Sequence, residues 1–255
     1  MNSRILVGSG MLACASLIIL LSNWVSPWWC GLLQNVGAGI VTSLLLIFLY
    51  DRIMERRVED EAQARRKVAM SKLRSILRRH ISGALFEIYY GGAKEKPARD
   101  LSYLELLQGN FVDVALRVDM MALSMAAYPS KVEVGTFIAR SFSKFSVAID
   151  SWLAAYVGFV DGVIASKVEQ LSQNNYLGAA SDFERVVRAM ENLPEYKGIG
   201  VPIGNGEFLR EYIDSLIAVV CAVEGESLET LGNFQSSIWD RPYAKVGYAA
   251  MREAG

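Results

Sequence analysis

The sequence predicts an all-α membrane protein with three parts: an N-terminal two-helix transmembrane hairpin, a continuous juxtamembrane helix and a cytoplasmic up-and-down helical bundle. Three observations lead to this prediction. Residues 5–25 and 32–50 contain no charged side chain. In the rest of the chain, apolar residues recur at spacings of three and four, which is typical of amphipathic helices. No stretch of the 255 residues shows the apolar–polar alternation of a half-buried strand.

The two uncharged runs, of 21 and 19 residues, are each long enough to cross a membrane as a helix. A hydrocarbon core about 30 Å thick requires roughly 20 helical residues, each advancing about 1.5 Å. The second run begins only six residues after the first, which favours a retained hairpin over a cleaved signal peptide. We therefore expect residues 1–50 to form the hairpin, in contact with the lipid bilayer.

The charges that flank the hairpin predict its orientation. Arg4 precedes the first run, Arg52, Arg56 and Arg57 follow the second, and residues 26–31 between the runs are uncharged. Cytoplasmic flanks of membrane helices are enriched in Lys and Arg. We expect an integral inner (plasma) membrane protein with both termini in the cytoplasm and the loop of residues 26–31 outside.

Small and polar residues are concentrated in the second run. Small residues allow helices to approach closely in lipid, and they can pack the two spans together or pack them against other subunits. Neither run contains the ionisable side chains of a solitary transporter, so a pore would require a ring of hairpins. The candidates for oligomerisation or for lining such a pore are Asn35, Gly37, Gly39, Thr42 and Ser43.

Residues 51–92 predict a basic amphipathic helix that ends near Gly91 and Gly92. Residues 51–80 have a net charge of +5, whereas residues 81–255 have a net charge of −7. The basic face can dock on the acidic body, lie on anionic lipid, or bind phosphates of nucleic acid or a nucleotide. The candidate residues for a phosphate or an acidic partner are Arg65, Arg66, Lys67, Lys72, Arg74, Arg78 and Arg79.

His80 is the single histidine of the chain, and its position on the apolar stripe of this helix predicts a buried structural residue. The segment from Arg74 to His80 also resembles the Arg-x4–6-His pattern of HEPN-type ribonucleases, which are helical bundles. That resemblance implies that Arg74 and His80 act on the scissile phosphate at a dimer interface.

Residues 100–240 predict the helical bundle, and residues 241–255 a C-terminal tail. We expect a helix from a capping box at Ser102 and Glu105 to about Ala127, followed by helices over residues 130–172, 178–192 and 206–239. Residues 144–167 contain only two charges inside their lysine ends, so they are either a buried bundle helix or a third span. These two charges, Asp150 and Asp161, would share one helical face as polar contacts of a core or groove.

The motifs of the common enzyme classes are missing from the sequence. There is no CxxC pair, no Glu-x-x-His and no GxSxG, so we expect neither a metal nor a cofactor. The layout resembles small bacterial inner-membrane proteins, including membrane effectors of anti-phage systems. We expect a non-enzymatic homo-oligomer whose body binds or senses a cytoplasmic protein partner and whose hairpins form a pore or a membrane-perturbing assembly. The alternatives are a membrane-tethered HEPN-like ribonuclease and a membrane-anchored scaffold or adaptor.

Overall fold

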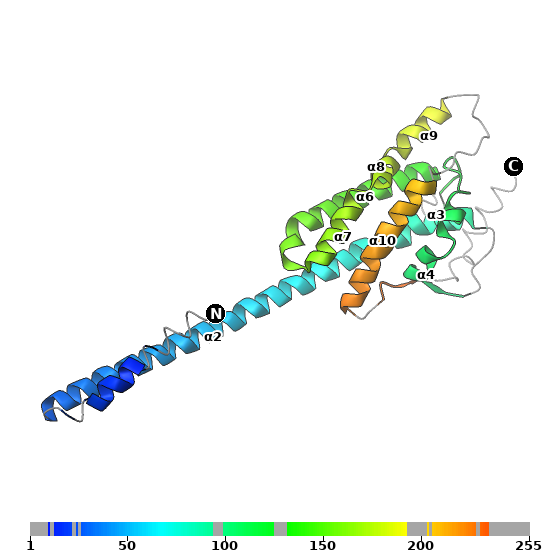
Figure 1. Ribbon diagram of the computed structural model, residues 1–255. Coiled ribbons are helices and arrows are strands. Elements are labelled where there is room, and N and C mark those ends of the chain that lie inside the picture. The colour runs from blue at the N-terminus through cyan, green and yellow to red at the C-terminus, as the bar shows by residue number, and fades with distance from the viewer. Residues whose placement is uncertain are drawn as a thin grey trace. The chain divides into compact units, whose positions relative to one another are not determined.

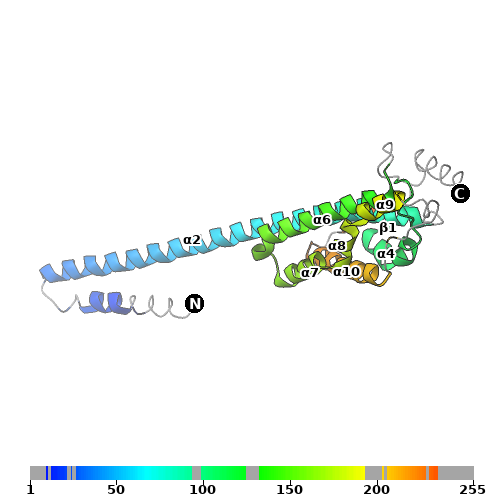
Figure 2. The same ribbon diagram turned by 90° about the horizontal axis from the view of Figure 1, so that it is seen from above.

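The computed structural model describes residues 10, 13–21, 24, 27–93, 99–124, 132–192, 203, 206–227 and 230–234. The chain divides into two compact units, residues 1–64 and residues 65–255. The described residues are mostly helical, with one short two-stranded sheet and an isolated β-bridge (Figures 1 and 2). The prediction of a helical protein is confirmed at this level.

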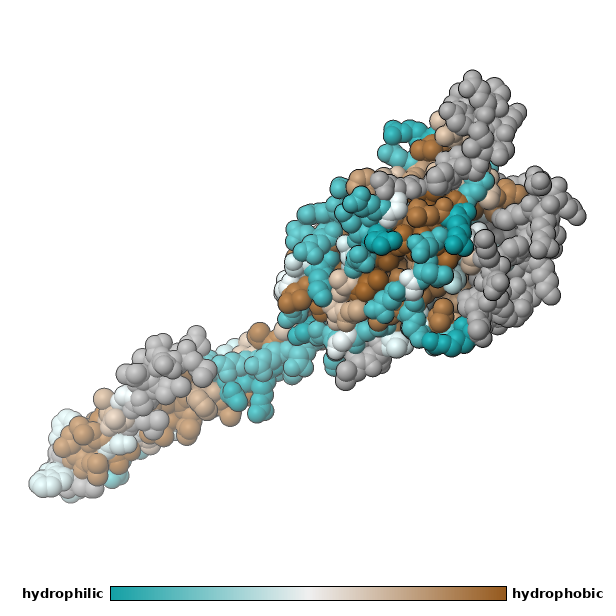
Figure 3. Space-filling view, turned by 45° about the vertical axis from the view of Figure 1, so that its right-hand side comes forward, coloured by the Kyte–Doolittle hydropathy of each residue, from teal (hydrophilic) through white to brown (hydrophobic). Residues whose placement is uncertain are grey.

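The first unit contains helical residues 13–21 and the N-terminal part of α2 (Pro27–His80). The two segments pack against each other where Gly37 of α2 meets Ile19. Apolar side chains remain exposed along both segments and form the brown surface around the N-terminal part of α2 in Figure 3. Among the described residues, one helical stretch, Trp29–Gly92, is long and apolar enough to cross a membrane.

The C-terminal part of α2 is a core element of the second unit. Buried residues repeat every four positions, at Ala69, Leu73 and Leu77 of α2 and at Ile81 and Leu85 just beyond its end, and all five are fully inaccessible. A four-residue repeat drifts around an α-helix of 3.6 residues per turn. The π-helix η1 (Ile81–Leu85) widens the turn where the drift would carry these residues out of the core.

The helix then continues as α3 (Phe86–Gly92). A Cβ atom at Gly92 would lie 2.0 Å from the carbonyl oxygen of Val114, so this close approach requires glycine. The helical stretch thus ends at the predicted glycines. Residues 65–92 belong to the same compact unit as the bundle helices.

The long helix expected from Ser102 to Ala127 is wrong. The structure has β1 (Leu101–Ser102), α4 (Tyr103–Gln108) and α5 (Phe111–Ala115), followed by turns. The capping box is confirmed, because the Glu105 amide donates to Ser102 Oγ at 3.1 Å and the Ser102 amide donates to Glu105 Oε2 at 2.7 Å. Gly109 ends α4 with a non-helical backbone. The sequence prediction ran the helix through this position because the apolar pattern continues beyond it.

The unbroken helix expected over residues 130–172 is also wrong. The structure has α6 (Val134–Tyr156), the short 3-10 helix η2 (Val157–Phe159) and α7 (Gly162–Ser172). Asp161 breaks the pattern as the N-cap of α7, with its Oδ1 accepting from the Val163 amide at 2.8 Å. Asp150 and Asp161 therefore share no helical face, and both are exposed rather than core contacts. Residues 144–167 lie on two helices of the second unit, not on one continuous span.

The remaining helices are α8 (Asn175–Ser181), α9 (Phe183–Glu191) and α10 (Gly206–Ser227). Residues 178–192 thus form parts of two helices rather than one, and the last helix ends before the predicted residue 239. Strand β2 (Asn233–Phe234) pairs antiparallel with β1. Helix α6 packs against α7, α8 and α9, and α10 packs against α4, α5, α7 and α8. The expected tail, residues 241–255, lies outside the described residues.

Candidate functional site

Helix α6 carries the aromatic residues that hold the basic helix in the second unit. Trp152 is buried, and its indole Nε1 donates a hydrogen bond of 2.8 Å to the carbonyl oxygen of Ala69 in α2. Towards the end of α6, the Lys72 ammonium lies 5.3 Å from the ring centre of Tyr156. The Arg65 guanidinium lies at the same distance from the ring of Phe159 in η2. These contacts direct positive charge onto aromatic faces, where it is attracted by the ring quadrupole.

Three other cations of α2 hold the C-terminal end of α10 and the residues that follow it. Arg66 forms an ion pair with Glu226. Arg74 Nη2 donates to the Thr230 carbonyl at 3.1 Å, and Arg78 Nε donates to the Leu231 carbonyl at 2.6 Å. The docking of the basic face on the body thus uses carbonyl oxygens and aromatic rings as well as a carboxylate.

The segment that receives Arg74 and Arg78 is fixed from other sides too. The Leu231 amide donates to Glu224 Oε1 at 2.7 Å, and the Gly232 carbonyl accepts from the Tyr103 amide at 3.1 Å. Gly232 has φ of 143°, which a residue with a side chain rarely adopts. A Cβ atom at this position would also lie 3.1 Å from the Tyr103 ring. The structure therefore needs a glycine where the chain leaves α10 and reaches β2.

The two other candidate cations, Lys67 and Arg79, are exposed on the outer side of α2. The seven residues predicted to bind a phosphate or an acidic partner thus divide into five that contact the second unit and two that face outwards. Sequence spacing does not separate the two sets, because the contacted groups of Arg66, Arg74 and Arg78 lie more than 150 residues away along the chain.

His80 is buried in the core, as its apolar neighbours predict. Its side chain is stacked on Phe145, with ring centres 3.9 Å apart, and its Nε2 lies 2.5 Å from the Tyr212 hydroxyl. Nδ1 has no hydrogen-bond partner among the described residues. Burial lowers the pKa of His80 from 6.5 to about 3, so the ring is neutral at physiological pH.

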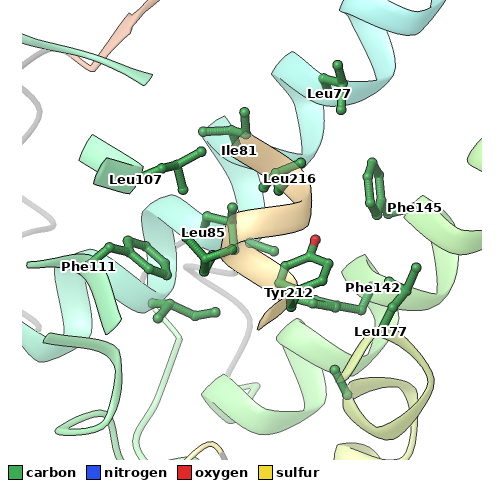
Figure 4. Close-up of a cluster of buried hydrophobic side chains, with 14 of the residues drawn as sticks. Leu77, Ile81, Leu85, Leu107, Phe111, Phe142, Phe145, Leu177, Tyr212 and Leu216 are labelled. Atoms are coloured by element: carbon green, nitrogen blue, oxygen red, sulfur yellow. The ribbon is translucent and has the colours of Figure 1, made fainter. Parts of the chain in front are cut away.

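Tyr212 and Tyr176 extend this buried polar cluster. Figure 4 shows Tyr212 of α10 beside Phe142 of α6, among leucines from neighbouring elements. The Tyr176 hydroxyl donates to the Ile203 carbonyl at 2.9 Å. Burial raises the pKa of both tyrosines, and the neighbouring Tyr176 adds to the rise at Tyr212. The sequence analysis did not identify these tyrosines; their helical spacing is an ordinary core signal.

Arg74 and His80 do not converge on one point. Six residues of α-helix separate their side chains by about 120° around the axis. Arg74 contacts the carbonyl of Thr230, whereas His80 faces Tyr212 and is only 4% exposed. This geometry does not present the pair to the phosphate of a bound RNA, as the HEPN resemblance would require.

The five hairpin candidates lie on two sides of α2. Gly37 faces the other helical segment, and a Cβ atom there would lie 2.7 Å from Ile19 Cγ1. Asn35, Gly39, Thr42 and Ser43 are exposed, and no described residue lies within 4 Å of a Cβ atom at Gly39. Gly37 therefore serves the packing within the first unit, whereas the other four residues face away from residues 13–21 and remain exposed.

No group of His, Cys, Asp and Glu side chains within the described residues could hold a metal ion. Cys14 and Cys221 are exposed free thiols, and Cys30 is a half-buried one. Comparisons of the chain with models of known protein families, with curated proteins and with solved structures gave no match.

Proposed function

We propose that the chain is an integral inner-membrane protein whose N-terminal hairpin anchors a cytoplasmic helical body and assembles with other copies to perturb or perforate the membrane. The observation that carries the anchoring is the exposure of the apolar stretch. In the most apolar 18-residue window of Trp29–Gly92, only 6% of the residues are buried. A core helix of a water-soluble domain would bury most of such a window.

The exposed apolar residues surround α2 rather than occupying one side of it. The six consecutive residues 45–50, all apolar or aromatic, are each 59–72% exposed. At about 100° per residue, six consecutive residues point in every direction around a helix. Exposed apolar surface costs about 25 cal/mol per Å² in water, and lipid removes that cost without a protein partner.

The outer side of α2 in the first unit supports assembly with other copies. Gly37 marks the side that faces residues 13–21. Asn35, Gly39 and Thr42 lie about 140–200° away around the helix, on the opposite side, and all three are exposed. Small and polar residues on a lipid-facing helix are favourable at a second helix–helix interface. The proposed pore or membrane-perturbing assembly would use this side.

The proposed topology places both termini and the second unit in the cytoplasm, because the basic flanks of the hairpin lie there under the positive-inside rule. The body would bind or sense a cytoplasmic protein partner without catalysis. A role as a bacterial anti-phage effector is supported only by the resemblance in layout. No observation favours the ribonuclease alternative, since His80 is buried in the core.

Mass measurement of the full chain in native-like nanodiscs, combined with dye leakage from vesicles, tests the proposal. We expect one defined oligomer and leakage that rises with its concentration. A monomer at all concentrations would exclude the assembly and leave only the anchor. Replacing residues 1–50 by an unrelated two-span anchor distinguishes the proposed assembly from the scaffold alternative. A scaffold would keep its function after this exchange, whereas a membrane-perturbing assembly would lose it.

A further inference from the structure

One exposed side of α2 in the second unit carries a stripe of cations and hydroxyl groups. Positions 67, 71, 75, 78 and 82 are spaced by three or four residues, so they share one face that continues into η1. This face lies opposite the buried residues Ala69 and Leu73. The stripe residues, all of them exposed, are Lys67, Ser71, Ser75, Arg78 and Ser82.

Within the described residues, no carboxylate pairs with the cations of the outer stripe or with their neighbours Lys72 and Arg79. Residues 62–86 contain no Asp or Glu. Within the described part of the chain, Lys67 and Arg79 make no ion pair, Lys72 contacts an aromatic ring, and Arg78 donates to a carbonyl oxygen. None of these contacts adds a negative charge to the face. Four cations and three hydroxyl groups therefore lie exposed on one side of the helix.

We propose that this outer stripe, with Lys72 and Arg79, binds the phosphate backbone of double-stranded nucleic acid. Lys, Arg and Ser are the side chains that commonly donate hydrogen bonds to backbone phosphates. The sixteen residues from Lys67 to Ser82 extend about 22 Å along the helix, which suits a row of phosphates rather than a single one. The stripe has no aromatic side chain on which unpaired bases could stack, which favours a duplex over a single strand.

A phosphate row is also a better match for this face than the membrane surface. Lys67 comes seventeen residues after Tyr50, the end of the uncharged run, which corresponds to about 25 Å of helix. Charges are screened over about 8 Å at physiological ionic strength. With four cations contacting phosphates, the logarithm of the binding constant falls with the logarithm of salt concentration with a slope of about −3 to −4. The acidic remainder of the chain makes the binding weak at physiological salt.

Fluorescence anisotropy with the full chain in zwitterionic nanodiscs tests the proposal, using a labelled 20-base-pair DNA duplex of arbitrary sequence. We expect binding that does not depend on sequence and weakens steeply between 50 and 200 mM salt. The double variant Lys67→Gln, Arg79→Gln should weaken binding at least tenfold at 50 mM salt and make the slope shallower by about 2. Neither side chain makes a hydrogen bond or an ion pair within the described residues, so the melting temperature of the variant should equal that of the wild type.

The matched control is the double variant Lys144→Gln, Arg185→Gln, which removes two exposed cations from α6 and α9. It should keep wild-type affinity. The proposal is overturned if the wild type binds the duplex no better than empty nanodiscs, or if the control loses as much affinity as the stripe variant. It is also overturned if the stripe variant loses association with phosphatidylglycerol vesicles and not with the duplex, because the face then binds lipid. None of these outcomes depends on whether the hairpin oligomerises.

Discussion

The Nε2 atom of His80 and the hydroxyl oxygen of Tyr212 lie 2.5 Å apart in the buried core, joining helices that are 132 residues apart in the chain. Tyr212→Phe would leave Nε2 without this partner in a site closed to water. We expect a loss of about 1–3 kcal/mol in the free energy of unfolding of the second unit. Denaturant unfolding in detergent measures this loss. Tyr50→Phe, at an exposed tyrosine of the first unit, is the control and should leave the stability of the second unit unchanged.

The pKa of His80, lowered to about 3 by burial, predicts how the second unit responds to acid. The unfolded chain binds a proton on this ring below pH 6.5, whereas the folded protein binds one only near pH 3. The protonation of this ring therefore has no effect on the free energy of unfolding above pH 6.5. Between pH 6.5 and 3 it lowers that free energy by about 1.4 kcal/mol per pH unit.

Nuclear magnetic resonance of the imidazole measures the pKa of His80 directly, because the chain has one histidine and its signals overlap with those of no other. The ring signals should show no titration between pH 8 and 5. A midpoint of 6 to 7 in the folded protein would mean that the ring is accessible to water, in contradiction to its burial. His80→Phe should remove this part of the acid sensitivity, since the new ring cannot be protonated.

The backbone conformation at Gly232 requires a residue without a side chain. Gly232→Ala should destabilise the second unit by about 1–3 kcal/mol, because a side chain is strained at φ of 143° and contacts the Tyr103 ring. Gly225→Ala is the matched control in α10, where a Cβ atom would meet no described residue within 4 Å. It should stabilise the protein by about 0.5–1 kcal/mol through higher helix propensity. Thermal unfolding of the two variants should therefore shift in opposite directions.

The proposed topology predicts which native thiols react from each side of the membrane. In intact bacterial cells, a membrane-impermeant maleimide should label Cys30, which lies within residues 26–31 proposed to be outside, and leave Cys221 unmodified. Permeabilised cells should show labelling of Cys221, which is exposed on α10. Mass spectrometry of the tryptic peptides identifies the labelled residue, and early labelling of Cys221 in intact cells would contradict a cytoplasmic body.

Some local features could be predicted from the sequence because a few neighbouring residues determine them. The capping box of Ser102 and Glu105 needs residues only three positions apart, and the burial of His80 follows from its place on an apolar stripe. The helix breaks were missed for a different reason. The spacing of Asp161 fits a helix interior, but the residue is the N-cap of α7. The apolar pattern also continues through η2, so it does not mark the end of α6.

The contacts of the basic helix could not be predicted at all. Arg74 and Arg78 contact backbone carbonyls more than 150 residues away, and a carbonyl group leaves no mark in a sequence. The same holds for Trp152, whose indole donates to the carbonyl of Ala69. Helical spacing also placed Gly37 and Gly39 in one set of candidates, although within the described residues only Gly37 contacts the segment of residues 13–21.

This difference between two glycines gives a direct test of assembly through the outer side of the hairpin. Gly39→Leu fills an open position on that side, whereas Gly37→Leu clashes with Ile19 inside the hairpin. Native mass spectrometry in nanodiscs should show that Gly39→Leu shifts the protein towards the monomer while it remains inserted and resists alkaline extraction. Gly37→Leu should instead impair the insertion or stability of the hairpin itself. An unchanged oligomer in the Gly39→Leu variant, or a monomeric wild type, would contradict assembly through this face.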